Sequence, residues 1–224
     1  KALQTRMQVH DKKTNYRIAP NLVRTDIFTP CESFKTDPDV QRQIRMISVC
    51  SAQRVKRHDI MFKTLKELID RGWNAKLTLY GVDEFNLPLV HQREELGLSD
   101  KIEFLGRADK QTLHGAFCRH DVYLCTSELE TFGLAPAEAI SSGLIVVSSD
   151  CGGVNEFLNE DNGILVHQPD TKNFADAVEM VAGKTRTTVS AWQSIHSRYG
   201  EEAFKNYWSK LYTEILTTWD SSLN

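Results

Sequence analysis

Long apolar runs are missing from this 224-residue sequence. None approaches the roughly 18 residues that a bilayer-spanning helix needs, so we predict no transmembrane segment. The first residues, Lys1-Ala2-Leu3, do not resemble a signal peptide, and an initiator methionine is lacking, so we expect a fragment or a processed form. Low-complexity tracts and internal repeats are also missing, which excludes repeat and fibrous architectures.

An excess of charge of one sign is missing too. The sequence has 27 Lys and Arg against 30 Asp and Glu, a net charge of -3, and no long basic run. A nucleic-acid partner is therefore not expected. With 25% charged and 41% hydrophobic residues, the composition is typical of a soluble globular protein with a full core, and the length suits one large domain.

Cysteine is scarce, and nothing about its spacing suggests a site. The five positions are Cys31, Cys50, Cys118, Cys125 and Cys151. They form no pair at metal-ligand or redox spacing, so we predict free thiols in a reducing compartment and a cytoplasmic protein. The seven histidines contain no His-x-His pair, so no metal site is expected. A Gly-x-Ser-x-Gly nucleophile elbow is also lacking, which argues against hydrolase chemistry.

What the sequence does contain is an alternation of two kinds of segment. Short apolar runs that predict strands lie near 46–49, 75–80, 102–105, 122–125, 145–148 and 164–166. Segments of helical period lie near 60–69, 87–96, 110–118 and 134–142, with a short one after Val154 and an all-helical tail after Pro169. This order predicts a doubly wound, Rossmann-like α/β domain with a parallel sheet.

The most informative stretch follows the predicted strand 122–125. It leads through Phe132-Gly133 into a helix, so backbone N–H groups and the positive end of a helix dipole point to one spot, where a phosphate can sit. Glu130 and Glu138 flank this turn with seven residues between them. Taken alone, the pair is equally well explained as acids placed to suit the helix dipole.

The surrounding sequence resembles the motif of retaining glycosyltransferases of the GT-B fold, especially family 4. The matching parts are Glu130, Phe132-Gly133-Leu134, Glu138-Ala139, Gly143, Val146-Val147, Gly152-Gly153 and Asn162–Val166. Further matches are Ile18–Asn21, Ile47–Val49, Ala75–Gly81, Glu95–Leu98 and Ile102–Arg107. The resemblance covers most of residues 17 to 219 and corresponds to the C-terminal half of such enzymes, which binds the nucleotide sugar.

The resemblance implies a role for each glutamate. Glu138 is expected to accept hydrogen bonds from the ribose hydroxyls, which suits a carboxylate. Glu130, the expected catalytic residue, contacts the transferred sugar near its anomeric carbon and supports an oxocarbenium-like transition state. The base is expected against the backbone around Gly106 and Arg107.

The diphosphate is expected between two walls of the same site. One wall is the turn at Phe132, with the N–H groups of Gly133 and Leu134. The other is the basic stretch after the first strand, where the family usually has Gly-Arg and a lysine five residues further on. Here Cys50-Ser51 replaces Gly-Arg, while Lys56 keeps the lysine position. Arg54 is the expected substitute cation, and Arg57 is more simply explained as a solvated loop residue.

The resemblance also divides the chain. Residues 1–30 are expected to be a linker from another domain, which carries the acceptor site, and residues 31–224 the nucleotide-sugar-binding domain. The expected donor is a UDP-, GDP- or ADP-sugar, with no metal and no cofactor. The longer protein is expected to be a hexosyltransferase-like enzyme, and this chain alone to transfer nothing. Any association with a membrane surface then belongs to the other half.

Two alternatives remain open at this point. The chain can be a non-catalytic nucleotide-sugar-binding module, which the change at Cys50-Ser51 favours, or another GT-B-like enzyme such as a sugar-nucleotide epimerase. A helical stripe of Trp208, Tyr212, Ile215 and Trp219 is also open to two explanations: core, or a surface that docks on the other domain.

The expected role of Lys56 can be tested by substitution. We predict that Lys56→Ala weakens nucleotide-sugar binding at least tenfold, about 1.4 kcal/mol, because the diphosphate loses its cation. Titration calorimetry measures the change, and an unaltered dissociation constant refutes the assignment.

Overall fold

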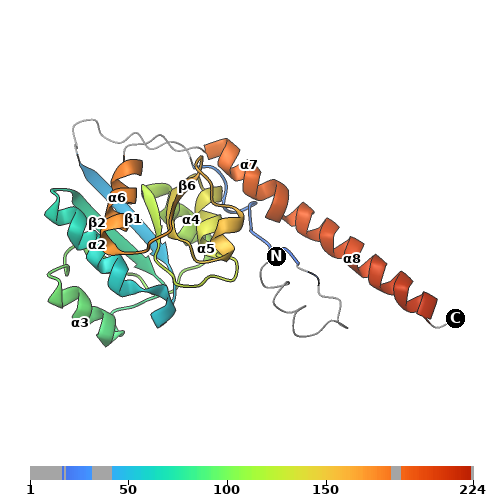
Figure 1. Ribbon diagram of the computed structural model, residues 1–224, viewed down its shortest axis with the longest axis horizontal. Helices are drawn as coiled ribbons and strands as arrows, with labels where there is room; N and C mark the ends of the chain where they lie inside the picture. Colours follow the sequence, from blue (N-terminus) through green and yellow to red (C-terminus); the bar gives the residue numbers. More distant parts are fainter. Residues whose placement is uncertain (1–16, 18, 32–41, 183–187, 223–224) are drawn as a thin grey trace.

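The computed structural model describes residues 17, 19–31, 42–182 and 188–222 (Figure 1). Most of the predicted linker, residues 1–16 and 18, lies outside the described residues.

Six parallel strands form one sheet in the order β3-β2-β1-β4-β5-β6. The strands are β1 (Gln43–Val49), β2 (Asn74–Tyr80), β3 (Ile102–Phe104), β4 (Val122–Cys125), β5 (Ile145–Ser149) and β6 (Gly163–Val166). This is the strand order of a doubly wound Rossmann fold, which confirms the predicted fold class.

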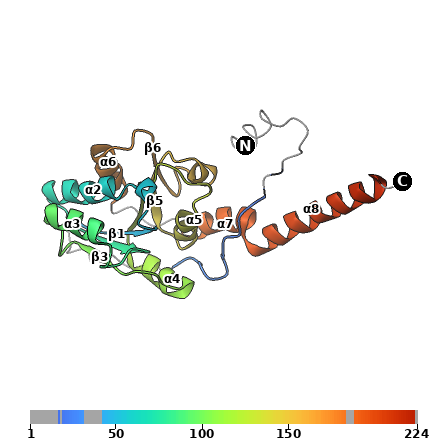
Figure 2. The ribbon, with the colours of Figure 1, turned by 90° about the horizontal axis from the view of Figure 1, so that it is seen from below.

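Helices cover both faces of the sheet. They are α2 (His58–Asp70), α3 (Leu87–Glu95), α4 (Lys110–Arg119), α5 (Leu134–Ser141), α6 (Thr171–Val181), α7 (Thr188–Tyr199) and α8 (Glu201–Ser222), with short 3₁₀ turns η1 (Arg54–Lys56) and η2 (Gly153–Glu156). Figure 2 places α2 and α6 on one side of the sheet and α4 on the other. Alternate strand residues face opposite layers: Met46 and Leu124 are buried with α2 and α6, Ile47 and Tyr123 with α4, α5 and α7.

The sheet divides between β1 and β4. These strands pair at Met46 with Val122 and at Ile47 with Tyr123, after which they diverge. The hydroxyl of the buried Tyr123 fills the gap, because it accepts a hydrogen bond from Val49 N (3.3 Å) and donates one to Val49 O (3.2 Å). The chain turns to opposite sides after β1 and β4, which leaves a crevice at their carboxyl ends, where open α/β sheets bind ligands.

The prediction of free thiols is wrong for two of the five cysteines. Cys31 and Cys118 form a disulfide across 87 residues of sequence, while Cys50, Cys125 and Cys151 are free. The sequence spacing gave no hint, since the contact depends on how residues 19–31 pack against α4, where the ring of Phe28 lies against that of Phe117. The cytoplasmic location, which rested on free thiols, stays a prediction.

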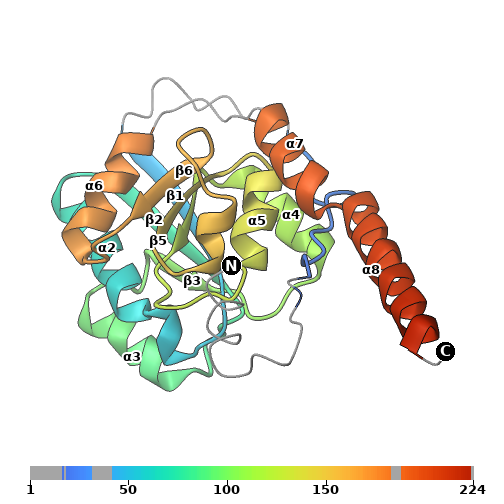
Figure 3. The ribbon, with the colours of Figure 1, turned by 45° about the vertical axis from the view of Figure 1, so that its right-hand side comes forward.

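Helix α8 leads away from the sheet (Figures 1 and 3). Its side chains Tyr212, Ile215 and Leu216 are 58%, 53% and 63% exposed. The core explanation of the stripe is therefore wrong for Tyr212 and Ile215, and the docking explanation stays a prediction. The side chain of Trp219 lies outside the described part of the chain.

Two glycines allow a matched test of the fold. A Cβ on Gly163 of β6 would meet the carbonyl oxygen of Val146 at 2.0 Å, whereas one on Gly115 of α4 would meet only the flexible end of Arg119 at 3.4 Å. We predict that Gly163→Ala lowers the free energy of unfolding by about 2 kcal/mol and that Gly115→Ala raises it by about 1 kcal/mol. Urea denaturation measures both, and equal effects contradict the described β5–β6 register.

Candidate functional site

Two of the predicted residues, Lys56 and Glu130, meet beyond the carboxyl ends of β1 and β4. Lys56, in the 3₁₀ turn after β1, meets Glu130, in the segment after β4: Lys56 Nζ lies 2.6 Å from Glu130 Oε1. Both side chains are 17% exposed. Ser127 Oγ donates a second hydrogen bond to the same oxygen at 2.8 Å. The two walls that the sequence predicted are therefore in direct contact.

The backbone of Glu130 is held as firmly as its side chain. Its N–H donates to Cys151 O, and its carbonyl accepts from Gly153 N, both at 2.8 Å. These bonds form a single bridge of β type between the segments after β4 and β5. The carboxylate is thus positioned at a fixed point, and its Oε2 accepts no hydrogen bond from any residue that the structure describes.

The 3₁₀ turn that carries Lys56 is fastened to the opposite wall. Thr126 Oγ1 donates to Lys56 O at 2.8 Å, and the N–H of Glu128 donates to Val55 O at 2.8 Å. Burial lowers the pKa of Lys56, but the hydrogen bond and the charge of Glu130 raise it more, so its net shift is upward. Lys56 therefore stays an ammonium ion at neutral pH.

The other two basic residues of this stretch differ in their surroundings. Arg57 bonds to Asp59 and to Glu128 at 2.9 Å, so its guanidinium is engaged in ion pairs rather than simply solvated, as was expected for a loop residue. Arg54 is exposed and makes no ion pair within the described residues. It stands close to Lys56 in the chain, and its charge is free to meet an anion.

The positions where the family usually has Gly-Arg carry no charge. Burial raises the pKa of the Cys50 thiol to about 11, so it stays protonated. Its sulfur lies 3.4 Å from Nε2 of His58, a ring that burial keeps neutral by lowering its pKa to about 4. Ser51 is exposed. The departure from the family pattern is therefore a real loss of one cation.

In the turn after Glu130, the side chain of Phe132 is buried while the backbone N–H groups that follow it stay available. The ring of Phe132 lies among Phe157 and Tyr199, with ring centroids 5.2 and 4.9 Å away. Gly133 has φ +90°, and a Cβ there would meet Val154 at 2.8 Å, so glycine is required. The N–H groups of Gly133 and Leu134 donate to no backbone carbonyl in the described part of the chain. Phe132 can therefore offer a ligand its backbone only.

Glu138 lies one helical turn further along, on α5. Its side chain is 9% exposed, and Lys110 Nζ donates to its Oε1 at 3.0 Å. Burial raises the pKa of Glu138, and Lys110 opposes this rise. Sequence reasoning missed Lys110. Its one clue was a place at the start of the predicted helix 110–118, directly after the loop expected to hold the base.

That loop is joined to the loops beside it. Gly106 accepts from Gly81 N at 2.6 Å and donates to Val82 O at 2.7 Å. Gly81 in turn leaves no room for a Cβ, which would lie 2.4 Å from the carbonyl oxygen of Cys50. The segments after β1, β2 and β3 thus form one continuous edge. Arg107 is exposed at this edge, without an ion pair in the described part of the chain.

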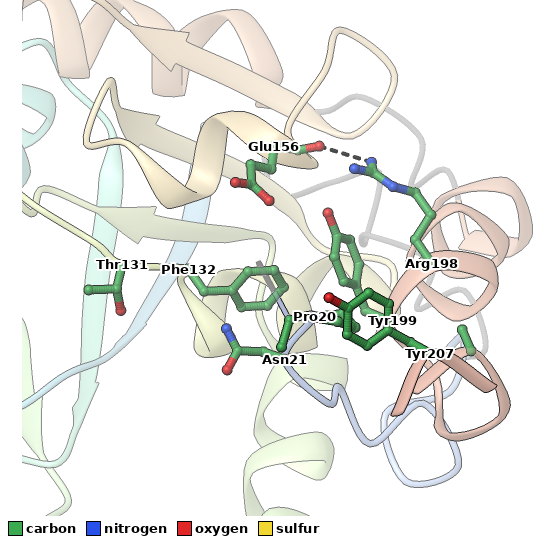
Figure 4. A pocket seen from close by; sticks show the side chains of 10 residues that line it. Pro20, Asn21, Thr131, Phe132, Glu156, Arg198, Tyr199 and Tyr207 are labelled. Atoms are coloured by element: carbon green, nitrogen blue, oxygen red, sulfur yellow. Dashed lines mark hydrogen bonds between the residues drawn. The ribbon is translucent and has the colours of Figure 1, made fainter. Parts of the chain in front are cut away.

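A cavity of about 360 Å³ borders the segment that follows Glu130, at Thr131 and Phe132 (Figure 4). It is lined by Ala19, Pro20, Asn21, Thr131, Phe132, Glu156, Arg198, Tyr199, Ala203 and Tyr207. Arg198 closes one side by donating to Glu156 O at 2.9 Å. Of the predicted site residues only Phe132 lines it, so the cavity belongs to the junction of residues 19–21 with α7 and α8.

Two further properties concern the metal and membrane predictions. Ligand-type atoms of Cys31, His114 and Cys118 lie within 4.8 Å of one another, a cluster that the sequence spacing did not show. The two sulfurs are bonded to each other, so they offer no thiolate to a metal. Among the described residues, no helix is both long and apolar enough to pass through a bilayer.

The chain matches the family described as glycosyl transferases group 1 over residues 32–186. A phosphatidylinositol N-acetylglucosaminyltransferase subunit of Arabidopsis thaliana is 28% identical over 160 residues, which are 71% of this chain and 35% of that protein. The Homo sapiens protein of the same name is 27% identical over 181 residues, 80% of this chain and 36% of that protein. The chain thus spans about a third of the length of these relatives.

Solved structures share the fold. TarM of S. aureus, crystallised with UDP among its ligands, has a TM-score of 0.78 at 18% identity over 94% of this chain and 42% of that chain. HepE of Anabaena, in complex with UDP and glucose, has a TM-score of 0.70 at 19% identity over 88% and 57%. The C-terminal domain of LpcC, a glycosyl transferase group 1 family protein of Francisella tularensis, has a TM-score of 0.63 at 21% identity, covering 80% of this chain and 99% of that domain.

The burial of Glu138 predicts a pH-dependent stability. Its pKa in the folded chain is above the unfolded value, so ionising it opposes folding once the pH rises past the unfolded value of about 4.3. We predict that Glu138→Gln, without ligand, is at least as stable as the parent at pH 7 and that the difference vanishes towards pH 4. Thermal unfolding across this pH range measures it. A variant that is clearly less stable at pH 7 contradicts the assignment.

Proposed function

Because the chain belongs to the glycosyl transferases group 1 and has the fold of the C-terminal domain of a GT-B enzyme, we propose that it binds the nucleotide-diphosphate sugar donor of a retaining glycosyltransferase. The observation that carries the proposal is the meeting of Lys56 and Glu130 at 2.6 Å in the crevice between β1 and β4. The proposed cation for the leaving diphosphate and the proposed anion for the reacting sugar are thus in direct contact.

The diphosphate fits between Lys56 and the start of α5. The N–H groups of Gly133 and Leu134 supply donors and the helix dipole supplies a positive field. Lys56 turns from Glu130 towards the phosphates, and the exposed Arg54 adds the second charge that Ser51 does not supply. These cations stabilise the charge that develops on the departing diphosphate, and the proposal therefore needs no metal.

Glu130 then has a carboxylate available for the sugar. Oε2 has no partner among the described residues, and Oε1 keeps only its bond from Ser127 when Lys56 turns to the phosphates. The carboxylate can accept hydrogen bonds from sugar hydroxyls and stabilise positive charge near the anomeric carbon. Ser127 and the backbone bonds to Cys151 and Gly153 keep it in place throughout. Retention of the anomeric configuration is part of the proposal and rests on the family resemblance.

The nucleoside lies beyond the diphosphate. Glu138 accepts from the ribose hydroxyls, and the base lies at the edge formed by Gly106 and Arg107. Because the base is expected to contact backbone atoms, the residue types at this edge do not identify it, so UDP-, GDP- and ADP-sugars are all candidates. Since TarM and HepE were each solved with UDP, a uridine donor is the first of these to test.

The acceptor site belongs to a further domain in this proposal. The exposed apolar side chains of α8, Tyr212, Ile215 and Leu216, and the cavity between the linker and α7–α8 support a face that such a domain covers. Closure of the two domains excludes water from the donor. The longer protein is then the enzyme, and the chain by itself binds donor without transferring the sugar. Contact with a membrane surface, if the acceptor is a lipid, belongs to that domain.

A second candidate is a nucleotide-sugar-binding module without catalysis. The uncharged Cys50 and Ser51 at the clamp position favour it, because a weaker clamp slows departure of the diphosphate more than it weakens binding. It shares the donor site and differs only in turnover by the longer protein.

Nucleotide binding by this chain tests the proposal. We predict that one of UDP, GDP and ADP binds, and that Glu138→Gln weakens it at least tenfold, about 1.4 kcal/mol. Glu94→Gln, an exposed acid on α3, serves as control and leaves the constant within twofold. Calorimetry gives the constants. Binding of none of the three nucleotides, or equal losses in both variants, rejects the proposed site.

A further inference from the structure

Lys110 has no role in the function described so far, yet it contacts the most buried acid of the site. Its Nζ lies 3.0 Å from Oε1 of Glu138 and is the one side-chain donor to that carboxylate within the described residues. The Glu138 side chain is 9% exposed and that of Lys110 is 45% exposed. The contact therefore joins a buried carboxylate to a half-exposed cation.

The carboxylate needs such a partner. Burial alone raises the pKa of Glu138 and so favours the neutral acid, while the hydrogen bond and charge of Lys110 favour the ionised form. An ionised carboxylate accepts hydrogen bonds at both oxygens, whereas a neutral acid gives up one acceptor position to its own proton. Vicinal ribose hydroxyls are two donors, so only the ionised form serves both.

The ammonium group of Lys110 is itself held in place. Asp109 caps α4 by accepting from Thr112 N at 2.8 Å, which fixes the first turn where Lys110 lies. The ammonium lies 5.7 Å from the ring centroid of Phe28, a fully buried linker residue. A cation–π contact at this distance restrains the side chain in addition to its bond to Glu138.

We propose that Lys110 is a positioning residue that sets the preference for a ribonucleotide by holding the Glu138 carboxylate towards the ribose hydroxyls. The proposal rests on the donor site described above and assigns to it a determinant that the family motif does not contain. Lys110 touches Glu138 and leaves Oε2 of that carboxylate for the ligand. Its effect must then depend on the presence of the ribose hydroxyls.

A ligand pair isolates that dependence. The nucleoside diphosphate that binds the parent chain most tightly, among UDP, GDP and ADP, is titrated beside its 2′,3′-dideoxy analogue. The hydroxyl preference is the dissociation constant of the dideoxy analogue divided by that of the ribonucleotide. A change of net charge alters both constants alike and cancels in the ratio, so the ratio separates positioning from long-range attraction of the phosphates.

We expect this ratio to be at least fivefold lower in Lys110→Met than in the parent chain. In Lys110→Arg, which keeps the positive charge, we expect it to stay within twofold of the parent. Lys101→Met is the matched control. It removes the same charge from a lysine that pairs with Asp100 before β3, and it leaves the ratio unchanged. If Lys110→Met does not fold, as judged by circular dichroism, Lys110→Gln takes its place with the same expected loss.

If Lys110→Met weakens both ligands by the same factor, or weakens neither, the ratio is unchanged. Either result overturns the role of Lys110 and leaves the donor site standing. Failure of the parent chain to bind any of the three diphosphates overturns the proposed function and this inference with it.

Discussion

The ion pair of Lys56 and Glu130 is the interaction on which the rest of the site depends. It spans the place where β1 and β4 part, so it joins the two halves of a doubly wound sheet where both supply loops to one crevice. The Tyr123 hydroxyl closes the gap below it. Both charges are partly buried, and each is the partner of the other while no ligand is bound. A bound diphosphate can then replace Glu130 as the partner of Lys56.

Around this pair, some residues hold the turn in place and others are left to contact a ligand. The ring of Phe132 holds the turn in an aromatic cluster, and Gly133 and Gly153 allow a close backbone approach, because a Cβ would lie 2.8 Å from Val154 at the first and 2.4 Å from Phe132 at the second. On the next helix Glu138 is buried at a cost that Lys110 reduces. Both carboxylates of the site are thus largely buried, and each is paired with one lysine. This arrangement is typical of sites where a charge serves a ligand rather than stability.

Local pattern predicted much of this structure from the sequence. Strand runs such as 122–125 and the helix after Gly133 were legible because apolar period and glycine are local signals. Contacts between residues far apart in the sequence were not legible. The Cys31–Cys118 disulfide and the pair of Lys110 with Glu138 depend on how residues 19–31 and α4 pack against each other and against α5. The motif placed Glu130 and Lys56 in one site but could not show that they meet.

The donor site can be located by a crystal structure of this chain with the nucleoside diphosphate that it binds. We expect the ribose at Glu138 and the diphosphate between Lys56 and the N–H groups of Gly133 and Leu134. We also expect Lys56 Nζ to have moved from Glu130 to a phosphate oxygen. A nucleotide in the cavity between residues 19–21 and α7–α8, or one bound with the Lys56–Glu130 pair intact, contradicts the proposed site.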